Sequence, residues 1–154
     1  MDCRTCMSPL STPLYTYQSA GTVIDFMRQH HLDCVPIVDR DNKFAGLVST
    51  EKLMRMLLPK SISMMRGIKH ASYLHESIDD LQERMNDIRS QLIGDLLDPH
   101  AQTVHPEAAL ADALLLISEH QNVVPVVLDN GRLMGAISYF SIMHAVEATH
   151  GKTA

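Results

Sequence analysis

The chain has 154 residues, of which 45% are apolar and 20% charged, a balance typical of globular rather than disordered proteins. Its formal net charge of −5 and its thirteen scattered basic residues argue against sequence-independent binding to nucleic-acid phosphates. No run approaches the roughly 20 apolar residues that span a bilayer, and the first residues lack the apolar core of a secretory signal. With only three cysteines, a reducing cytoplasm is the expected location, and neither nucleic acid nor membrane is an expected partner.

The first half of the chain reads, in order, as strand, helix, two strands and helix. A short strand is expected over residues 13–17, and an amphipathic helix over 20–30, where apolar residues recur at helical spacing. Residues 34–49 form two apolar runs around a polar turn, which predicts two strands joined by a tight connection. The apolar residues of the closing helix that follows are Leu53, Met54 and Leu57.

Residues 59–92 are longer than a simple linker between two halves requires. We expect a loop over 59–76 and a helix over 78–92, preceded by Ser77, with Asp80 completing a variant of the capping box. The apolar residues of this helix recur at spacings of three and four: Ile78, Leu81, Met85, Ile88 and Leu92. Such a seam reinforces a dimer or docks a partner; alternatively, the helix lies on the protein's own surface.

The second half repeats the order of the first. A strand is expected over 103–105, a helix over 110–120, and two strands over 123–138, where Asn130 and Gly131 both tolerate the positive φ of a hairpin turn. The apolar residues of its closing helix are Ile142, Met143 and Val146. The two-strand blocks align without a gap at a spacing of 89, which pairs Pro36 with Pro125, Gly46 with Gly135 and Ser49 with Ser138.

The pair Cys3 and Cys6 invites a metal or redox interpretation. A zinc site needs a second pair of ligands at a suitable spacing, and the sequence contains no such pair. At an offset of 90 the two cysteines overlie Ile93 and Leu96, which favours their packing as small hydrophobic residues. The nine histidines are dispersed without a metal-binding pattern, so no metal site is expected.

Each half therefore has the order β-α-β-β-α, with a proline in its first apolar run and Gly-apolar-apolar-Ser at the end of its second. This pattern resembles the CBS domain, and two tandem copies resemble a CBS pair, or Bateman module. The resemblance implies an α/β (α+β) fold of two repeats, 1–58 and 93–154, packed about a pseudo-twofold axis with the insertion 59–92 and its helix 78–92 between them. It also implies two clefts between the repeats that hold adenosine ligands, and assembly as a homodimer.

The resemblance places Ser49 and Ser138 at the cleft mouths, where their hydroxyls donate to a phosphate or ribose; both are also expected N-caps of the closing helices. Ligand-binding members usually have a ribose-binding Asp three positions later, but this chain has Lys52 and Ser141. Lys52 either pairs with a phosphate or is a solvated surface residue, and Ser141 bonds a ribose weakly. The remaining expected wall residues are Tyr15, Thr16, Tyr17, Cys34, Val35, Val104, His105, Val123 and Val124. Either tyrosine stacks on a purine or belongs to the core.

Two functions follow from the resemblance. The first is a cytoplasmic regulatory module that binds AMP, ADP, ATP or S-adenosylmethionine and signals through its dimer to an unidentified partner in trans. The second is a dimerisation or interaction scaffold whose clefts have degenerated and bind no nucleotide. An enzyme is not expected, because no nucleophile–base pair, metal set or Gly-rich phosphate loop is present, and no cofactor is expected beyond the adenosine ligand.

Overall fold

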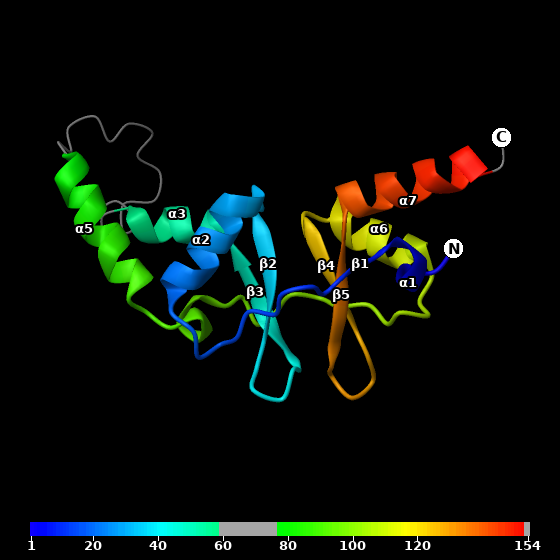
Figure 1. The fold of residues 1–154 in the computed structure, drawn as a ribbon, viewed down its shortest axis with the longest axis horizontal. Coiled ribbons are helices and arrows are strands. Elements are labelled where there is room, and N and C mark those ends of the chain that lie inside the picture. Colours follow the sequence, from blue (N-terminus) through cyan, green and yellow to red (C-terminus); the bar gives the residue numbers. More distant parts are fainter. Residues whose placement is uncertain (59–76, 153–154) are drawn as a thin grey trace.

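The computed structural model describes residues 1–58 and 77–152, which form two similar halves side by side, with their strands at the centre and helices outside (Figure 1). The first half contains α2 (Ala20–His30), β2 (Cys34–Val38), β3 (Phe44–Ser49) and α3 (Thr50–Leu57). The second contains α6 (Leu110–Ser118), β4 (Val123–Val127), β5 (Leu133–Ser138) and α7 (Tyr139–Lys152). The predicted mixed fold of two tandem repeats is confirmed. Across the two described ranges, no helix has the length and apolar character needed to cross a membrane.

The first strand of each repeat is shorter than expected. The segments 13–17 and 103–105 each make one parallel bridge, Tyr15 to Val38 and Val104 to Val126, rather than a strand. Prolines at 13 and 106 have no N–H to donate, so the ladder ends close to each bridge. The helix expected over 110–120 ends at Ser118, because the chain turns through His120 with a positive φ of 81°.

The two hairpins use the same turn, which differs in detail from the expected one. Only one residue in each turn has positive φ, Asn42 at 63° and its equivalent Gly131 at 89°, whereas Asn130 does not. The pairing register shifts just before each turn, after Ile37 and after Val126, as it does where a bulge adds a residue to one strand. The tips of the hairpins then meet through a backbone bridge between residues 43 and 132, which relates the two repeats as a pseudo-twofold pair.

The repeats exchange short segments. Near the N-terminus, α1 (Cys3–Cys6) and β1 (Ser8–Pro9) pack on the second half, where Ser8 pairs with Ala136 of β5. In return, the 3-10 helix η1 (Ile93–Leu96) packs into the first half, and the following Asp98 pairs with Leu47 of β3. Packing therefore crosses the division of the chain into residues 1–58 and 93–154.

Close approach at these crossings explains the glycine of each repeated block. A Cβ on Gly135 would lie 2.3 Å from the carbonyl oxygen of Ser8, and a Cβ on Gly46 would lie 2.7 Å from that of Asp98. Real Cβ atoms do not approach oxygen so closely, so any larger residue forces the crossing segment away from its strand. The glycines at a spacing of 89 are thus requirements of the segment exchange.

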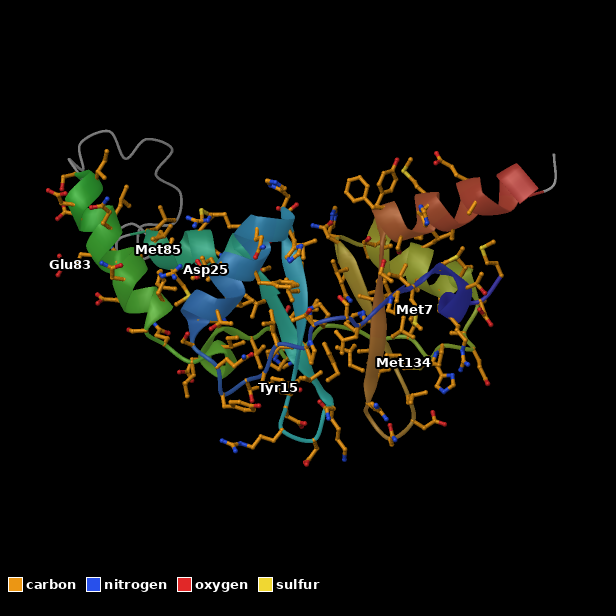
Figure 2. All side chains as sticks on the ribbon, in the orientation of Figure 1. Met7, Tyr15, Asp25, Glu83, Met85 and Met134 are labelled. Atoms are coloured by element: carbon orange, nitrogen blue, oxygen red, sulfur yellow. The ribbon has the colours of Figure 1, made fainter. Side chains whose placement is uncertain are left out.

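Each half has its own apolar core. The first is built from eleven buried residues, namely Leu14, Ala20, Val23, Met27, Val35, Ile37, Val48, Leu53, Ile88, Ile93 and Leu96. The second is smaller and consists of Cys3, Val104, Ala113, Val124, Val126 and Ile137, with Met7 and Met134 packed against it (Figure 2). Cys3 and Cys6 are 0% and 1% exposed, which confirms that they pack as hydrophobic residues. Burial raises the pKa of both thiols.

The inserted helix α5 (Ile78–Arg89) lies on the first repeat and is three residues shorter than expected. Its capping box is present, because Ser77 and Asp80 exchange side-chain-to-backbone hydrogen bonds. Ile88 is buried in the first core, and Met85 lines a groove against α2 and α3, whereas Glu83 points to solvent (Figure 2). This end of the expected seam therefore packs on the protein's own surface. Its other members, Ile78, Leu81 and Leu92, are exposed.

Candidate ligand clefts between the repeats

Two clefts form where the repeats face each other, one at the start of each closing helix. The Ser49 cleft comprises hollows of about 560 and 350 Å³ that share Ser49, Glu51 and Asp98. The Ser138 cleft comprises hollows of about 200 and 310 Å³ that share Leu32, Cys34, Val123 and Ser138. Both repeats line each cleft, so each cleft depends on the two halves being assembled.

The serines at the cleft mouths are N-caps. Ser49 Oγ accepts a hydrogen bond from the Lys52 N–H at 3.3 Å. Ser138 Oγ accepts from the Ser141 N–H at 3.3 Å, while Ser141 Oγ accepts from the Ser138 N–H at 2.9 Å and donates to the Ser138 carbonyl at 3.0 Å. The expected capping role is therefore confirmed for both serines. The Ser141 hydroxyl, expected to reach a ribose, is instead engaged within the cap.

Lys52 spans the edge of the Ser49 cleft. Its Nζ donates to the carbonyl oxygen of Leu97 at 3.1 Å, which ties α3 to the crossing segment that follows η1. The side chain is half-buried rather than fully solvated, and this hydrogen bond uses one of the three donors of its ammonium group. At the position where the resemblance leads one to expect a ribose-binding Asp, this chain therefore has a lysine that is hydrogen-bonded to the Leu97 carbonyl.

The two clefts differ in charge. The Ser49 cleft contains acidic, basic and histidine side chains, namely Asp33, Glu51, Asp98, Lys52, Arg55, His100 and His120. The Ser138 cleft is mainly apolar and hydroxylic, and among the described residues that line it Asp33 and His31 are the ones of these three kinds. At its rim the exposed rings of Tyr139 and Phe140 meet edge to face, with centroids 5.8 Å apart.

Cys34 lies between the two clefts and lines both. Burial, and then the negative charge of Asp98, raise the pKa of its thiol to about 12. A thiol with such a pKa is protonated at neutral pH and is a poor nucleophile. Cys34 therefore contributes shape rather than reactivity to the clefts.

Three of the expected wall residues gather at the first hairpin turn instead. Tyr15 is labelled in Figure 2, and its hydroxyl donates to Asn42 at 3.3 Å. The rings of Tyr15 and Tyr17 stack at a centroid distance of 5.2 Å, and the Arg40 guanidinium lies 4.7 Å from the Tyr17 centroid. Thr16 bonds through its backbone to Val38 of β2. None of the three lines either cleft as defined above.

The remaining expected residues divide between clefts and core. Val35 and Val123 line the Ser138 cleft beside Cys34. Val104 and Val124 are buried in the second core, and His105 lies 3.5 Å from the Asp129 carboxylate, outside both clefts. Sequence reasoning missed the wall formed by Ser8, Pro9, Leu10, Ser11 and Thr12 and the residues at positions 97–100. The two segments are equivalent, because residues 8–10 align with residues 98–100 at an offset of 90. This alignment was visible in the sequence, but it does not reveal that each segment crosses to the other repeat.

Comparison with known sequences assigns this arrangement to a family. The sequence profile of the CBS domain matches residues 9–59 and 93–148. The chain belongs to the CBS domain family. The two matches coincide with the two repeats, so the chain carries a CBS pair, and CBS pairs are regulatory modules.

The relatives of this CBS pair are distant in sequence. The CBS domain-containing protein CBSX1, chloroplastic, of Arabidopsis thaliana is 24% identical over 128 residues, covering 79% of this chain; the chain spans about half of that relative, 53% of its length. The crystal structure of CBSX2 in complex with AMP matches with a TM-score of 0.69 at 18% identity, covering 97% of this chain and 98% of that chain. The crystal structure of CbpB in complex with c-di-AMP matches with a TM-score of 0.67 at 17% identity, covering 99% and 89%. At these identities the structural matches establish the fold of the CBS pair.

Proposed function

We propose that this CBS pair is a cytoplasmic regulatory module that binds an adenosine-type ligand between its repeats and signals to a partner in trans. The observation that carries the proposal is the Ser138 cleft, where an apolar hollow between the repeats ends at the first turn of α7. Apolar walls suit a purine, and the hydroxyls of the wall suit a ribose. Two proteins of the same fold were crystallised with AMP and with c-di-AMP, which supports an adenine ligand.

The test of this proposal is ligand-dependent stability. A compound that binds only the folded state raises the melting temperature by mass action. We expect at least one of adenosine, AMP, ADP, ATP, S-adenosylmethionine and c-di-AMP to raise the Tm of the full chain, with guanosine as the matched control that does not. Absence of a shift with all six at millimolar concentration would contradict the proposal.

We further propose that the module is a homodimer. Helix α7 exposes Tyr139, Phe140, Met143 and Val146, which are 61%, 79%, 40% and 49% exposed and recur at helical spacing. Contiguous apolar residues on one helix face favour burial against a second copy. We expect Met143→Glu to reduce the mass measured by light scattering to that of a monomer, while Ala111→Glu, on the exposed face of α6, leaves it unchanged. A Met143→Glu protein with wild-type mass would remove α7 from the interface.

The scaffold function is the second candidate, and one observation favours it. Neither cleft has a carboxylate at the third position after its serine, because Lys52 and Ser141 stand there and both are engaged in internal hydrogen bonds. A protein that dimerises through α7 and binds none of the six compounds would match the scaffold and not the sensor.

A further inference from the structure

Helix α1 places two thiols and a thioether close together on the second repeat. Cys3 and Cys6 are neighbours on the surface of this helix, three positions apart, and they are 0% and 1% exposed. The Cys6 thiol donates to the thioether of Met1, with 3.1 Å between Sγ and Sδ. Two further thioethers, those of Met7 and Met134, pack against the same core (Figure 2). α1 therefore lies among soft donor atoms.

The equivalent segment of the other repeat shows that burial alone does not require sulfur. At the offset of 90, the two cysteines correspond to Ile93 and Leu96 of η1, which are also 0% and 1% exposed. Met7 corresponds in the same way to Leu97. Hydrocarbon side chains thus fill the three positions in η1, whereas sulfur-containing side chains fill all three at α1. This difference points to a role for the sulfur atoms beyond packing.

The donor atoms select the class of metal. Thiolate and thioether sulfur are soft ligands that favour Cu(I), whereas structural Zn²⁺ takes four ligands, mostly from Cys and His. In the described part of the chain, no group of three or more His, Cys, Asp or Glu side chains could hold a metal ion. The neighbouring Asp2 carboxylate is engaged as the N-cap of α1, where it accepts from the N–H and the hydroxyl of Thr5. Two thiolates and one thioether suit Cu(I) and leave a Zn²⁺ shell incomplete.

We propose that Cys3, Cys6 and Met1 bind one Cu(I) ion. The two cysteines coordinate as thiolates, Met1 supplies its thioether, and both thiol protons pass to solvent as the metal binds. The Cys3 thiol now donates to the Ala109 carbonyl at 3.6 Å, and that carbonyl keeps its bond from the Asp112 N–H at 3.0 Å, so no acceptor is left unpaired. The inference is independent of the proposed function, because neither cysteine lines either cleft.

The metal has a route to the thiols that leaves the fold in place. Met1, whose side chain contacts Cys6, is 59% exposed and has the flexibility of an unbranched thioether chain. The backbone of α1 is held separately, by N–H bonds to the carbonyls of Ala108 and Pro106 at 3.0 and 2.9 Å. Rotation of the Met1 side chain therefore gives access to Cys6 while α1 stays on the second repeat.

The experiment is an anaerobic titration of the reduced full chain with Cu(I), in competition with the chromophoric Cu(I) chelator bathocuproine disulfonate. The variants are Cys3→Val and Cys6→Val, which introduce hydrocarbon as in η1, and the matched control is Cys34→Val, which removes the third thiol. We expect one Cu(I) per chain, unchanged in Cys34→Val. Loss of an outer-shell partner already weakens metal binding about 10–100-fold, so loss of either cysteine ligand should weaken it at least about a hundredfold.

Two further measurements complete the test. A thermal melt verifies that each variant folds, and serine replaces valine at either cysteine if the valine is not accommodated. X-ray absorption at the copper edge of the loaded wild-type chain should show sulfur neighbours alone. An equimolar amount of Zn²⁺ should displace no Cu(I) from the chain.

Several results would overturn the inference. These are copper left entirely with the chelator, wild-type affinity in a folded Cys3 or Cys6 variant, loss of binding in Cys34→Val, and nitrogen or oxygen neighbours in the absorption spectrum. Displacement of Cu(I) by Zn²⁺ would overturn the choice of metal. None of these results bears on the adenosine-type ligand, whose test is the shift in Tm described above.

Discussion

Replacing Gly135 with alanine tests the segment exchange directly. The new Cβ would lie 2.3 Å from the Ser8 carbonyl oxygen, about 1 Å inside an ordinary carbon–oxygen contact, so β1 must move away from β5. The displacement overpacks the crossing, at a typical cost of about 1–3 kcal/mol, and weakens pairing that includes the Leu10 N–H bond to the Met134 carbonyl at 3.1 Å. We expect Gly135→Ala to lower the free energy of unfolding by about 3 kcal/mol.

Urea denaturation followed by circular dichroism measures this loss, with Gly21→Ala as control. The three atoms nearest to a Cβ on Gly21 all belong to the Arg89 guanidinium, the closest at 3.2 Å, and this group is the far end of a long side chain. Alanine is also favoured over glycine within a helix by about 1 kcal/mol, so the control stays within about 1 kcal/mol of wild type. A Gly135→Ala protein as stable as the control would refute the close approach of β1 to β5.

Three further predictions concern the inserted helix and the thiol of Cys34. Ile88→Ala should lower the free energy of unfolding by about 2–4 kcal/mol without changing the oligomeric mass, because Ile88 is 4% exposed and belongs to the first core. The control Ile78→Ala, at a position that is 73% exposed, should change the free energy of unfolding by less than about 0.5 kcal/mol. Hydrogen bonds from Arg89 hold the pKa of Asp25 below its ordinary value of 3.8. Asp25→Asn should therefore lower the free energy of unfolding at pH 7, and this loss should disappear as the pH falls through the lowered pKa. A difference in unfolding free energy between Asp25→Asn and wild type that persists in strong acid would contradict the pairing. Cys34, with a pKa of about 12, should resist iodoacetamide at pH 8 in the native protein and react in urea, as read by mass spectrometry.

Much of the fold follows from local patterns in the sequence. The hairpins and closing helices were predictable because each rests on neighbouring residues: an apolar run, a turn and a capping serine. The capping box at Ser77 and the buried Cys3 and Cys6 were predictable for the same reason, the latter through alignment with Ile93 and Leu96. Turn geometry was predicted less well, because the bulge that leaves Asn130 with ordinary φ depends on pairing with the other strand.

The clefts were predictable only in part. Ser49, Lys52, Cys34 and Val123 line the hollows between the repeats, and all four lie in or next to the repeated blocks that the sequence makes visible. The wall at 8–12 was missed, since it reaches the Ser138 cleft only after crossing to the other repeat. Tyr15 and Tyr17 were assigned to the clefts, but they lie at the hairpin turn, where their rings stack on each other and Arg40 lies over the ring of Tyr17. The sequence pattern around the two tyrosines does not predict the contact with Arg40.

The exchange of segments also determines how the chain can be divided. The first half contributes α1 and β1 to its neighbour, and η1 makes the reverse contribution, so each half expressed alone would lack part of its own core. When two such polypeptides are mixed, one ending at residue 58 and the other beginning at residue 77, each supplies what the other lacks: the first carries α1 and β1, and the second carries η1. The architecture therefore makes this chain a natural split reporter, in which two fragments regain structure and the Ser138 cleft only on meeting.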